Sequence, residues 1–333
     1  HKQNVNYLVV DANTETGAPW LKRWDSLKLF TPSEFNSLPG LKFPHEKGHY
    51  ADKYEVADYL KSYVAAFNIP VAFNHKITSL KKENGVFKLK SNLKEFEAKN
   101  VIIATGPFHK PFTPSCHLKI SEDVLQIHSE HYKSTEQLQE GATLVVGAGD
   151  SGVQILSEIS KTNTPVYFSG NTNITSLPQE ILGKTLWWWF HKVGFLTANK
   201  YSWIGKMLSK TGQPVIGTDL KTLFKKENIT CVGRTLDANA QSITFEKQEV
   251  TDIKNIVWAT GFKPNFSWID GIELDQSNYP KNYRGVSKTI DGLYFLGLPW
   301  LYTRGSATLG GVQRDAKYLN TYLFKKETKK ALA

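Results

Sequence analysis

Cysteine is scarce in this chain: Cys116 and Cys231 are the only two among 333 residues. Two cysteines cannot form a disulfide framework or a zinc cage of cysteines, and their wide separation excludes a C-x-x-C redox pair. An electron route through a protein dithiol is therefore not expected. The low cysteine content also favours a reducing, cytoplasmic environment.

Long apolar runs are missing as well. No stretch approaches the ~18 apolar residues of a membrane span, and the opening residues lack a signal-peptide pattern, so we expect neither feature. Lys and Arg outnumber Asp and Glu by 41 to 31, which gives a net charge of +10. This surplus would attract polyanions such as dinucleotide cofactors; no nucleic-acid-binding module accompanies it, so nucleic acid is not an expected partner. Part of it lies in residues 325–330, expected to form a solvated tail.

The composition that remains is globular, with 40% hydrophobic and 22% charged residues. The chain length corresponds to about two domains of ~150 residues each. The strongest local motif is a glycine turn, residues 147–152, between an apolar strand at 143–146 and an amphipathic helix. In a G-x-G-x-x-G turn the first glycine allows the bend, the second lets the backbone approach a pyrophosphate, and the third lets helix and strand pack closely.

The free N–H groups at the start of the following helix suit phosphate. The alternative is a turn that only needs small residues. The dinucleotide contacts predicted from this turn are Gly147, Gly149, Asp150, Ser151 and Gly152.

The next strand, residues 165–168, ends without an acid. An acid there would bind the ribose 2′-hydroxyl of NADH, so its absence favours the 2′-phosphate of NADPH. We interpret Ser169 as a phosphate contact, the alternative being an ordinary strand-end residue. No Arg stands in the segment 169–172 to bind the phosphate.

Two further strands, within 101–106 and 255–261, both end in Ala-Thr-Gly. One copy precedes the glycine turn and the other follows it, which predicts two related dinucleotide-binding domains, one inserted in the other. Thr260 and Gly261 join the NADPH set in this interpretation. The other expected elements are a strand over 6–10 that ends at Asp11, a helix over 53–68, a hairpin turning at 84–85, a strand over 292–297 and a closing helix over 311–319.

Several stretches follow one another in the order of a known family. They are Gly17-Ala18-Pro19-Trp20, residues 24–32 (WDSLKLFTP), residues 53–60 (KYEVADYL), Ala104-Thr105-Gly106-Pro107-Phe108, the glycines of 147–152, residues 176–183 (SLPQEILG), Ala259-Thr260-Gly261-Phe262 and residues 292–297 (GLYFLG). With them the chain resembles the flavin-containing monooxygenase-like proteins, in the bacterial branch of NAD(P)/FAD-dependent flavoprotein oxidoreductases. The resemblance spans nearly the whole chain.

The resemblance implies an α/β fold of two Rossmann-like dinucleotide-binding domains, with the NADPH domain inserted in the FAD domain. The implied boundaries are 1–115 and 263–333 for the FAD domain and 116–262 for the NADPH domain. The implied activity is that of a monooxygenase-like oxidoreductase, in which hydride passes from NADPH to the flavin and then to oxygen. A small-molecule substrate and oxygen, or another small electron acceptor, would be the partners. No catalytic side chain is assigned, because this chemistry belongs to the cofactor.

The resemblance also implies flavin-side residues, position by position. Asp11 resembles the ribose ligand, Gly17 and Trp20 would lie along the flavin, and Ile77 would meet the adenine through its backbone. The start of the closing helix would favour negative charge on the reduced ring. The full implied FAD set is Asp11, Gly17, Trp20, Thr31, Ile77, Thr105, Gly106, Gly297, Leu298, Gly311, Val312 and Gln313.

The chain departs from the family pattern in three places. The family's FAD strand and glycine turn would lie ~20–30 residues before Asp11, ahead of residue 1. The fingerprint F-x-G-x-x-x-H-S-x-x-Y/F persists as residues 128–132, with Glu122 and Val124 at its Phe and Gly positions. The flavin-side Asn that follows a Thr in the animal enzymes is Pro32. Two alternatives therefore stay open: an NADPH-dependent flavin reductase of a small disulfide or quinone, and a non-catalytic NADPH-binding redox sensor.

Histidines and tryptophans complete the expectations. His128 and His131 lack a third metal ligand at a suitable spacing and are expected to hydrogen-bond at a domain linker. His45 and His49 are expected at the surface of a Gly-containing loop, so no metal is predicted. Residues 186–190 (LWWWF) are expected to pack into the core or to form a subunit contact, as in a homodimer. A lid over an apolar substrate and a peripheral membrane patch are the alternatives.

Overall fold

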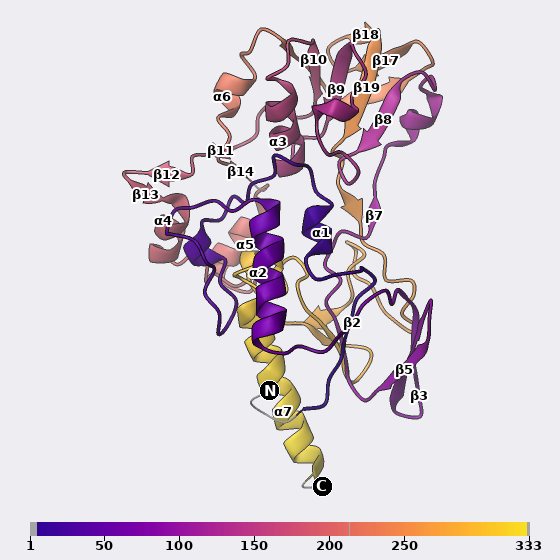
Figure 1. Cartoon of the computed structure of the whole chain (residues 1–333), viewed down its shortest axis with the longest axis vertical. Coiled ribbons are helices and arrows are strands. Elements are labelled where there is room, and N and C mark those ends of the chain that lie inside the picture. Colours follow the sequence, from indigo (N-terminus) through magenta and orange to yellow (C-terminus); the bar gives the residue numbers. More distant parts are fainter. Residues whose placement is uncertain (1–4, 213, 332–333) are drawn as a thin grey trace.

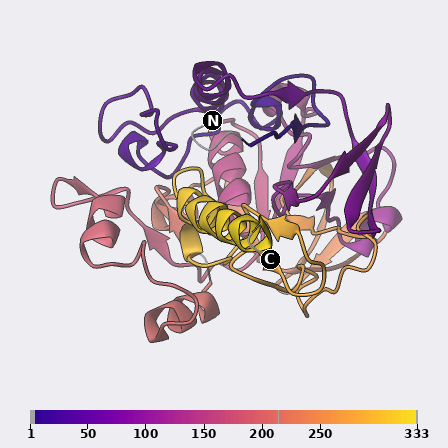
Figure 2. The same cartoon turned by 90° about the horizontal axis from the view of Figure 1, so that it is seen from below.

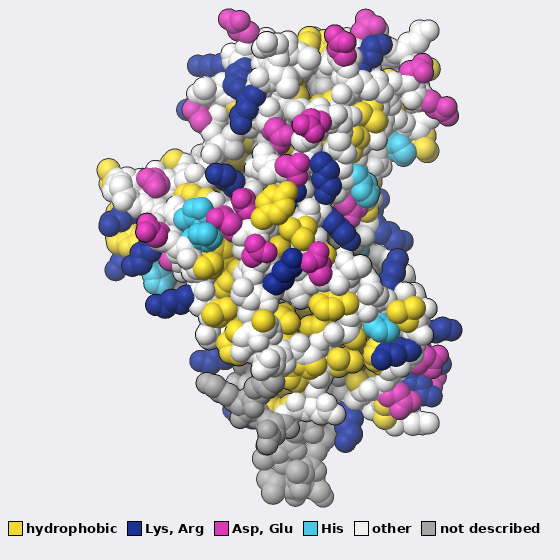
Figure 3. All heavy atoms as spheres, viewed as in Figure 1, with side chains coloured by type: hydrophobic (Ala, Val, Ile, Leu, Met, Phe, Trp, Pro, Cys, Tyr) yellow, Lys and Arg dark blue, Asp and Glu magenta, His cyan; other side chains and the backbone are white. Residues whose placement is uncertain are grey.

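The computed structural model describes residues 5–212 and 214–331. A parallel sheet occupies one end of the molecule in Figure 1, and the long helix α7 (Gln313–Ala331) reaches toward the opposite end. The fold is α/β, as predicted. No helix in the described ranges is long and apolar enough to cross a bilayer. Figure 3 shows basic and acidic side chains interspersed over the face it presents, so the net positive charge does not form one patch there.

The five-stranded sheet has the order β15-β10-β9-β19-β8, and all neighbouring strands are parallel. Its strands read as short apolar runs because both faces are covered. Helix α3 (Asp150–Ile159) covers one face, and a small antiparallel sheet covers the other. The parallel strands are β8 (Leu125–His128), β9 (Ala142–Val146), β10 (Val166–Ser169), β15 (Ile229–Gly233) and β19 (Ile253–Trp258); the covering strands are β16 (Thr235–Ala238), β17 (Ser242–Phe245) and β18 (Glu249–Thr251).

A second sheet joins segments from both halves of the chain. Strand β6 (Val101–Ile103) pairs in parallel with β23 (Leu293–Phe295), which continues into β22 (Val286–Ser287) and β21 (Asn282–Tyr283). Next to it lies an antiparallel sheet of β3 (Ile77–Glu83), β4 (Val86–Ser91) and β5 (Glu95–Ala98). The hairpin predicted at Asn84-Gly85 is confirmed: both residues have positive φ, as a two-residue β-turn requires.

The N-terminal region contributes a short parallel pair and a capped helix. Strand β1 (Val9–Val10) pairs with β2 (Val71–Ala72), and α1 (Ala18–Leu21) packs on α2 (Lys53–Ala66). A reciprocal capping box between Asp52 and Glu55 begins α2. The helix ends two residues earlier than predicted, at Ala66, ahead of Pro70.

The remaining elements are short, apart from α7. They are η1 (Ser33–Phe35), β7 (Lys110–Pro111), η2 (Ser115–Lys119), η3 (Thr135–Gln137), β11 (Ser176–Leu177), β12 (Glu180–Ile181), β13 (Lys184–Thr185), α4 (Leu186–Lys192), α5 (Trp203–Lys210), β14 (Val215–Ile216), α6 (Leu220–Leu223), β20 (Phe262–Lys263) and η4 (Arg304–Ala307). The prediction that α7 ends at 319 and gives way to a tail is wrong. The helix continues to Ala331, since Lys, Glu and Leu are good helix formers.

The tryptophan run forms α4, and Figure 2 shows the stretch that carries α4 and α5 projecting to one side of the molecule. Leu186 is buried, whereas the rings of Trp187, Trp188 and Trp189 are half-buried. Trp187 stacks on Phe30 and donates its Nε1–H to the Phe30 carbonyl at 2.9 Å. Packing of this run into the core is therefore wrong, because a helix as short as α4 leaves its three indoles partly exposed; the subunit contact stays a prediction.

Candidate dinucleotide sites

The glycine turn lies at the carboxyl end of β9, in the middle of the parallel sheet. Strand order reverses here, since β10 and β15 follow on one side of β9 and β19 lies on the other. In open α/β sheets, ligands bind outside the strand ends at such a switch point. The sheet thus places residues 147–152 where a dinucleotide would bind.

The three glycines of the turn differ in the space around the position where a Cβ would lie. A Cβ on Gly147 would lie 2.2 Å from the Ala259 carbonyl oxygen, and one on Gly152 would lie 2.0 Å from that of Gly147. A Cβ on Gly149 would meet no described atom within 4 Å. Close packing therefore explains the first and third glycines, whereas the second borders open space. This is the arrangement expected when a pyrophosphate approaches the second glycine.

Helix α3 begins directly at this open position, with Gly149 as its N-cap and no side-chain cap. Asp150 and Ser151 form its first turn, and its first N–H groups have no intrahelical acceptor. The charge of Asp150 acts on Arg304 of η4, opposing the lowering of the Arg304 pKa by burial. A residue from the C-terminal part of the chain therefore lies near the glycine turn.

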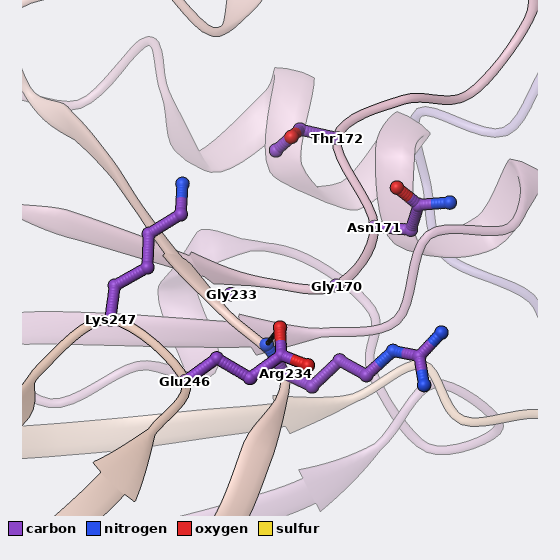
Figure 4. Close-up of a pocket in the computed structure, with 7 residues that line it drawn as sticks. All are labelled: Gly170, Asn171, Thr172, Gly233, Arg234, Glu246 and Lys247. Carbon is purple, nitrogen blue, oxygen red and sulfur yellow. Dashed lines mark hydrogen bonds between the residues drawn. The ribbon is translucent and has the colours of Figure 1, made fainter.

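A cavity of about 390 Å³ opens at the ends of β10 and β15 (Figure 4). Its lining residues are Gly170, Asn171, Thr172, Gly233, Arg234, Glu246 and Lys247. The Glu246 carboxylate accepts the Arg234 backbone N–H at 2.9 Å, which anchors the start of the loop that carries Arg234. Two cationic side chains, Arg234 and Lys247, thus line the corner where a ribose 2′-phosphate is expected.

Sequence reasoning missed this pair. It searched for an Arg only in the segment after β10, whereas Arg234 follows the neighbouring strand β15. The carboxyl ends of adjacent parallel strands meet at one edge of a sheet. The available signal was therefore the Gly233-Arg234 step directly after the short apolar segment that forms β15.

Ser169, predicted as a phosphate contact, is 2% exposed, and its hydroxyl hydrogen-bonds Thr235 Oγ1 at 2.7 Å. It does not line the cavity. We therefore correct that prediction: Ser169 joins β10 to β16, and the cavity is lined by the residues that follow it.

Thr260 and Gly261, also predicted on the NADPH side, lie where the chain leaves β19. The Thr260 hydroxyl donates to the Phe112 carbonyl, and the Phe112 N–H donates to the Gly261 carbonyl at 2.9 Å. His128 Nε2 donates to the same carbonyl at 3.0 Å, while its Nδ1 accepts the Glu130 N–H. The predicted linker hydrogen bond of His128 is confirmed, and burial lowers the pKa of its imidazole.

Five of the predicted FAD residues precede Thr105, and four of them lie on or next to β1, α1 and β3. Asp11 follows β1, and its Oδ1 accepts two hydrogen bonds from Asn13, both 2.8 Å long. Gly17 has φ +83°, and a Cβ there would lie 2.8 Å from the Ala57 Cα, so it allows α1 to approach α2. Trp20 is half-buried beside α2, and Ile77 begins β3.

Thr31 lies close to the start of α7. Its hydroxyl donates to Asn36 Oδ1 at 2.6 Å, Asn36 Nδ2 donates to the Thr31 carbonyl at 3.0 Å, and both residues are buried. A Cβ on Gly310 would lie 1.7 Å from the Phe35 carbonyl oxygen. The structure therefore brings Thr31 together with the segment Gly311-Val312-Gln313. Sequence reasoning missed Asn36 because it looked for an Asn directly after the Thr.

Thr105 and Gly106 follow β6, and Gly297 and Leu298 follow its parallel partner β23. The two turns therefore meet at one sheet edge. Gly106 and Gly297 have φ of +70° and +75°, and a Cβ at either would meet no described atom within 4 Å. Thr105 Oγ1 pairs with His109 Nε2 at 3.0 Å, whereas Leu298 is buried in the core.

Residues 1–180, more than half of the chain, match the pyridine nucleotide-disulphide oxidoreductase family. The chain belongs to this family. It is 41% identical over 319 residues to an uncharacterized CzcO-like oxidoreductase of Geobacillus kaustophilus, covering 96% of this chain and 91% of that protein. It is 40% identical to an uncharacterized oxidoreductase CzcO of Bacillus subtilis, with 96% and 92% covered.

Among solved structures, the fold of this family member is similar to that of a flavin-containing monooxygenase from Stenotrophomonas maltophilia. The TM-score is 0.78 at 21% identity, and 98% of this chain and 92% of that chain are covered. The predicted resemblance to flavin monooxygenase-like proteins is confirmed, and so is the prediction that the chain is an enzyme, an oxidoreductase.

Proposed function

We propose that this chain is an FAD- and NADPH-dependent oxidoreductase of the monooxygenase-like kind. The observation that carries the proposal is the glycine turn at the switch point of the parallel sheet, with Gly149 facing open space and the cationic cavity one strand away. The bound cofactors would supply the chemistry: two electrons from NADPH would pass through the flavin to oxygen, one oxygen atom would enter a small-molecule substrate, and the other would leave as water.

The NADPH side would use the glycine turn and the cavity together. Gly147 and Gly152 keep helix and strand close, and the start of α3 binds the pyrophosphate. Arg234 and Lys247 provide the charge-assisted hydrogen bonds that a 2′-phosphate favours over a 2′-hydroxyl. Ser151 and Thr260 would complete the NADPH side together with Gly149, Asp150 and Gly261. The domain would comprise residues 116–262, inserted between 1–115 and 263–333, and the pairing of β6 with β23 supports this division.

The FAD side would be formed from both ends of the chain. Gly106 and Gly297 fit a cofactor because both have a free side where a Cβ would point. The Thr31–Asn36 pair and the start of α7, with Gly311, Val312 and Gln313, would border the ring, where the positive end of the helix dipole favours negative charge. Asp11, Gly17, Trp20, Ile77, Thr105 and Leu298 complete the proposed set. When bound, the flavin supplies the hydride acceptor and the oxygen chemistry; the protein positions it and excludes water.

A route through protein thiols receives no support. Burial raises the pKa of both Cys116 and Cys231, which lowers the fraction of reactive thiolate. A reductase activity would therefore require an added disulfide or quinone.

The test is a visible absorption spectrum of the purified protein supplied with FAD, recorded before and after NADPH is added without air. Flavin bands that bleach with NADPH and return with air support an oxygen-using enzyme. Bands that bleach but return only with a quinone or disulfide indicate a reductase instead. A protein that stays colourless with added FAD contradicts the proposal and leaves an NADPH-binding sensor.

A further inference from the structure

His45, His49 and Glu55 converge at the start of α2, apart from both dinucleotide sites. Each offers one ligand atom, and the three atoms lie within 4.8 Å of one another. Nε2 of His45 lies 3.2 Å from Oε1 of Glu55, and Nε2 of His49 lies 2.9 Å from Oε2. The two imidazole rings stack with 4.4 Å between their centroids. The two histidines, expected at the surface of a loop, therefore share one carboxylate.

We propose that these three side chains bind a divalent first-row cation of the Zn²⁺ class. Two imidazoles and one carboxylate are a ligand set that Zn²⁺ uses, with water in the remaining position. Ligand atoms ~2.1 Å from one tetrahedral ion lie about 3.4 Å apart. Oε1 of Glu55 lies 3.2 Å from Nε2 of His45 and 3.0 Å from Nε2 of His49. Both separations are close to this value, so small side-chain adjustments would admit the ion.

The ligands are held in place by neighbours that do not compete for the ion. Glu55 is the N3 residue of the capping box with Asp52, and its Oε2 accepts the Asp52 backbone N–H at 2.8 Å. The ring of His45 packs against Phe43, with 5.7 Å between centroids. Such outer contacts orient metal ligands and are part of a binding site. The His45 and His49 side chains are 32% and 39% exposed, which leaves an entry path from solvent.

The site is connected to the segment that carries Thr31. The His49 carbonyl accepts hydrogen bonds from the Ser33 N–H at 2.8 Å and from the Ser33 hydroxyl at 3.0 Å. Ser33 lies in η1, between Thr31 and Asn36. A bound ion would therefore fix the 45–49 loop both to α2 and to η1, so binding should stabilise the folded state as well as occupy the three ligands.

The experiment uses the purified full chain after treatment with a chelator and its removal. Co²⁺ is titrated while visible absorption is followed, and Zn²⁺ is then added to displace it and titrated separately by calorimetry. We expect one saturable site with a visible Co²⁺ spectrum that Zn²⁺ abolishes, and a rise in Tm with Zn²⁺. His45→Gln and His49→Gln should each lower the affinity at least tenfold. Glu55→Gln should do the same, yet Gln can still complete the capping box.

His131→Gln is the matched control, since His131 also lies beside a carboxylate, 3.7 Å from Glu130, but outside the three ligands. It should bind Co²⁺ like the unmodified chain. No saturable binding by the unmodified chain overturns the proposal, and so does equal binding by the His45→Gln and His49→Gln variants. If His49→Gln fails to fold, His45→Gln decides. Flavin reduction plays no part in this readout, so the outcome is independent of the proposed function.

Discussion

At the residue scale, we expect Arg234 and Lys247 in the cavity to decide between NADPH and NADH. Replacing both Arg234 and Lys247 with Ala should raise the KM for NADPH about ten- to a hundredfold, since a charge-assisted hydrogen bond contributes about 1.5–3 kcal/mol. The KM for NADH, which lacks the 2′-phosphate, should change little. Steady-state oxidation of both cofactors measures this. Lys263→Ala, outside the cavity lining, serves as the control. An equal loss with both cofactors would place the phosphate elsewhere.

Asp315 gives a residue-scale prediction about pH. It is 1% exposed, and burial raises its pKa; the Ser306 hydroxyl and the charges of Arg284, Lys200 and Arg314 oppose this shift without cancelling it. A carboxyl with a raised folded-state pKa holds its proton more tightly when folded, so its contribution to stability falls as pH rises from 3.8 through the folded-state pKa. Asp315→Asn should therefore raise Tm at neutral pH and much less at acidic pH. A Tm difference that grows on acidification would show that the sign is wrong.

At the element scale, the turn from β9 to α3 contains one glycine required for packing and one that borders open space. Substituting each of them should therefore separate an effect on stability from an effect on cofactor binding. Gly152→Ala should destabilise the fold by about 1–3 kcal/mol, because its Cβ would lie 2.0 Å from the Gly147 carbonyl oxygen. Gly149→Ala meets open space at a φ of −83° and should cost about 0.5–1 kcal/mol, because Ala is a poorer N-cap than Gly. It should nevertheless weaken NADPH binding at least tenfold by blocking the pyrophosphate. Urea unfolding and NADPH titration of both variants measure the two effects; normal NADPH affinity in Gly149→Ala would argue against the site.

Features that depend on local backbone conformation could be predicted from the sequence, and features that depend on distant contacts could not. The glycine turn and the Asn84-Gly85 hairpin were predictable because backbone conformation and spacing determine them locally. The positions of Arg234 and Asn36 were not predictable from local sequence. Arg234 lines the cavity with residues that follow the distant strand β10, and Asn36 reaches Thr31 because η1 turns the chain back. The 45–49 loop shows the same limit: Glu55 reaches the two histidines because α2 begins at Lys53, between His49 and Glu55.

At the scale of the whole molecule, the proposed boundary at 115 crosses a shared core. Trp24 and Leu27 pack in the same cluster as Val153 and Ile155 of α3. The Asp25 N–H donates to the Lys133 carbonyl at 2.8 Å, which adds a backbone link across the same boundary. Strands β7 and β20 pair where the chain crosses between the two sheets. These contacts couple the two regions, so neither should unfold alone.

This coupling predicts one thermal transition in scanning calorimetry. NADPH at a hundred times its Kd should stabilise the whole chain by about 2.7 kcal/mol and move that single transition upward. Leu27→Ala, which removes a side chain that bridges the regions, should cost about 2–5 kcal/mol and split the transition in two. Leu223→Ala, in the same cluster but on α6, should lower Tm without splitting it. Two transitions in the unmodified chain, of which NADPH moves only one, would mean that the regions unfold independently.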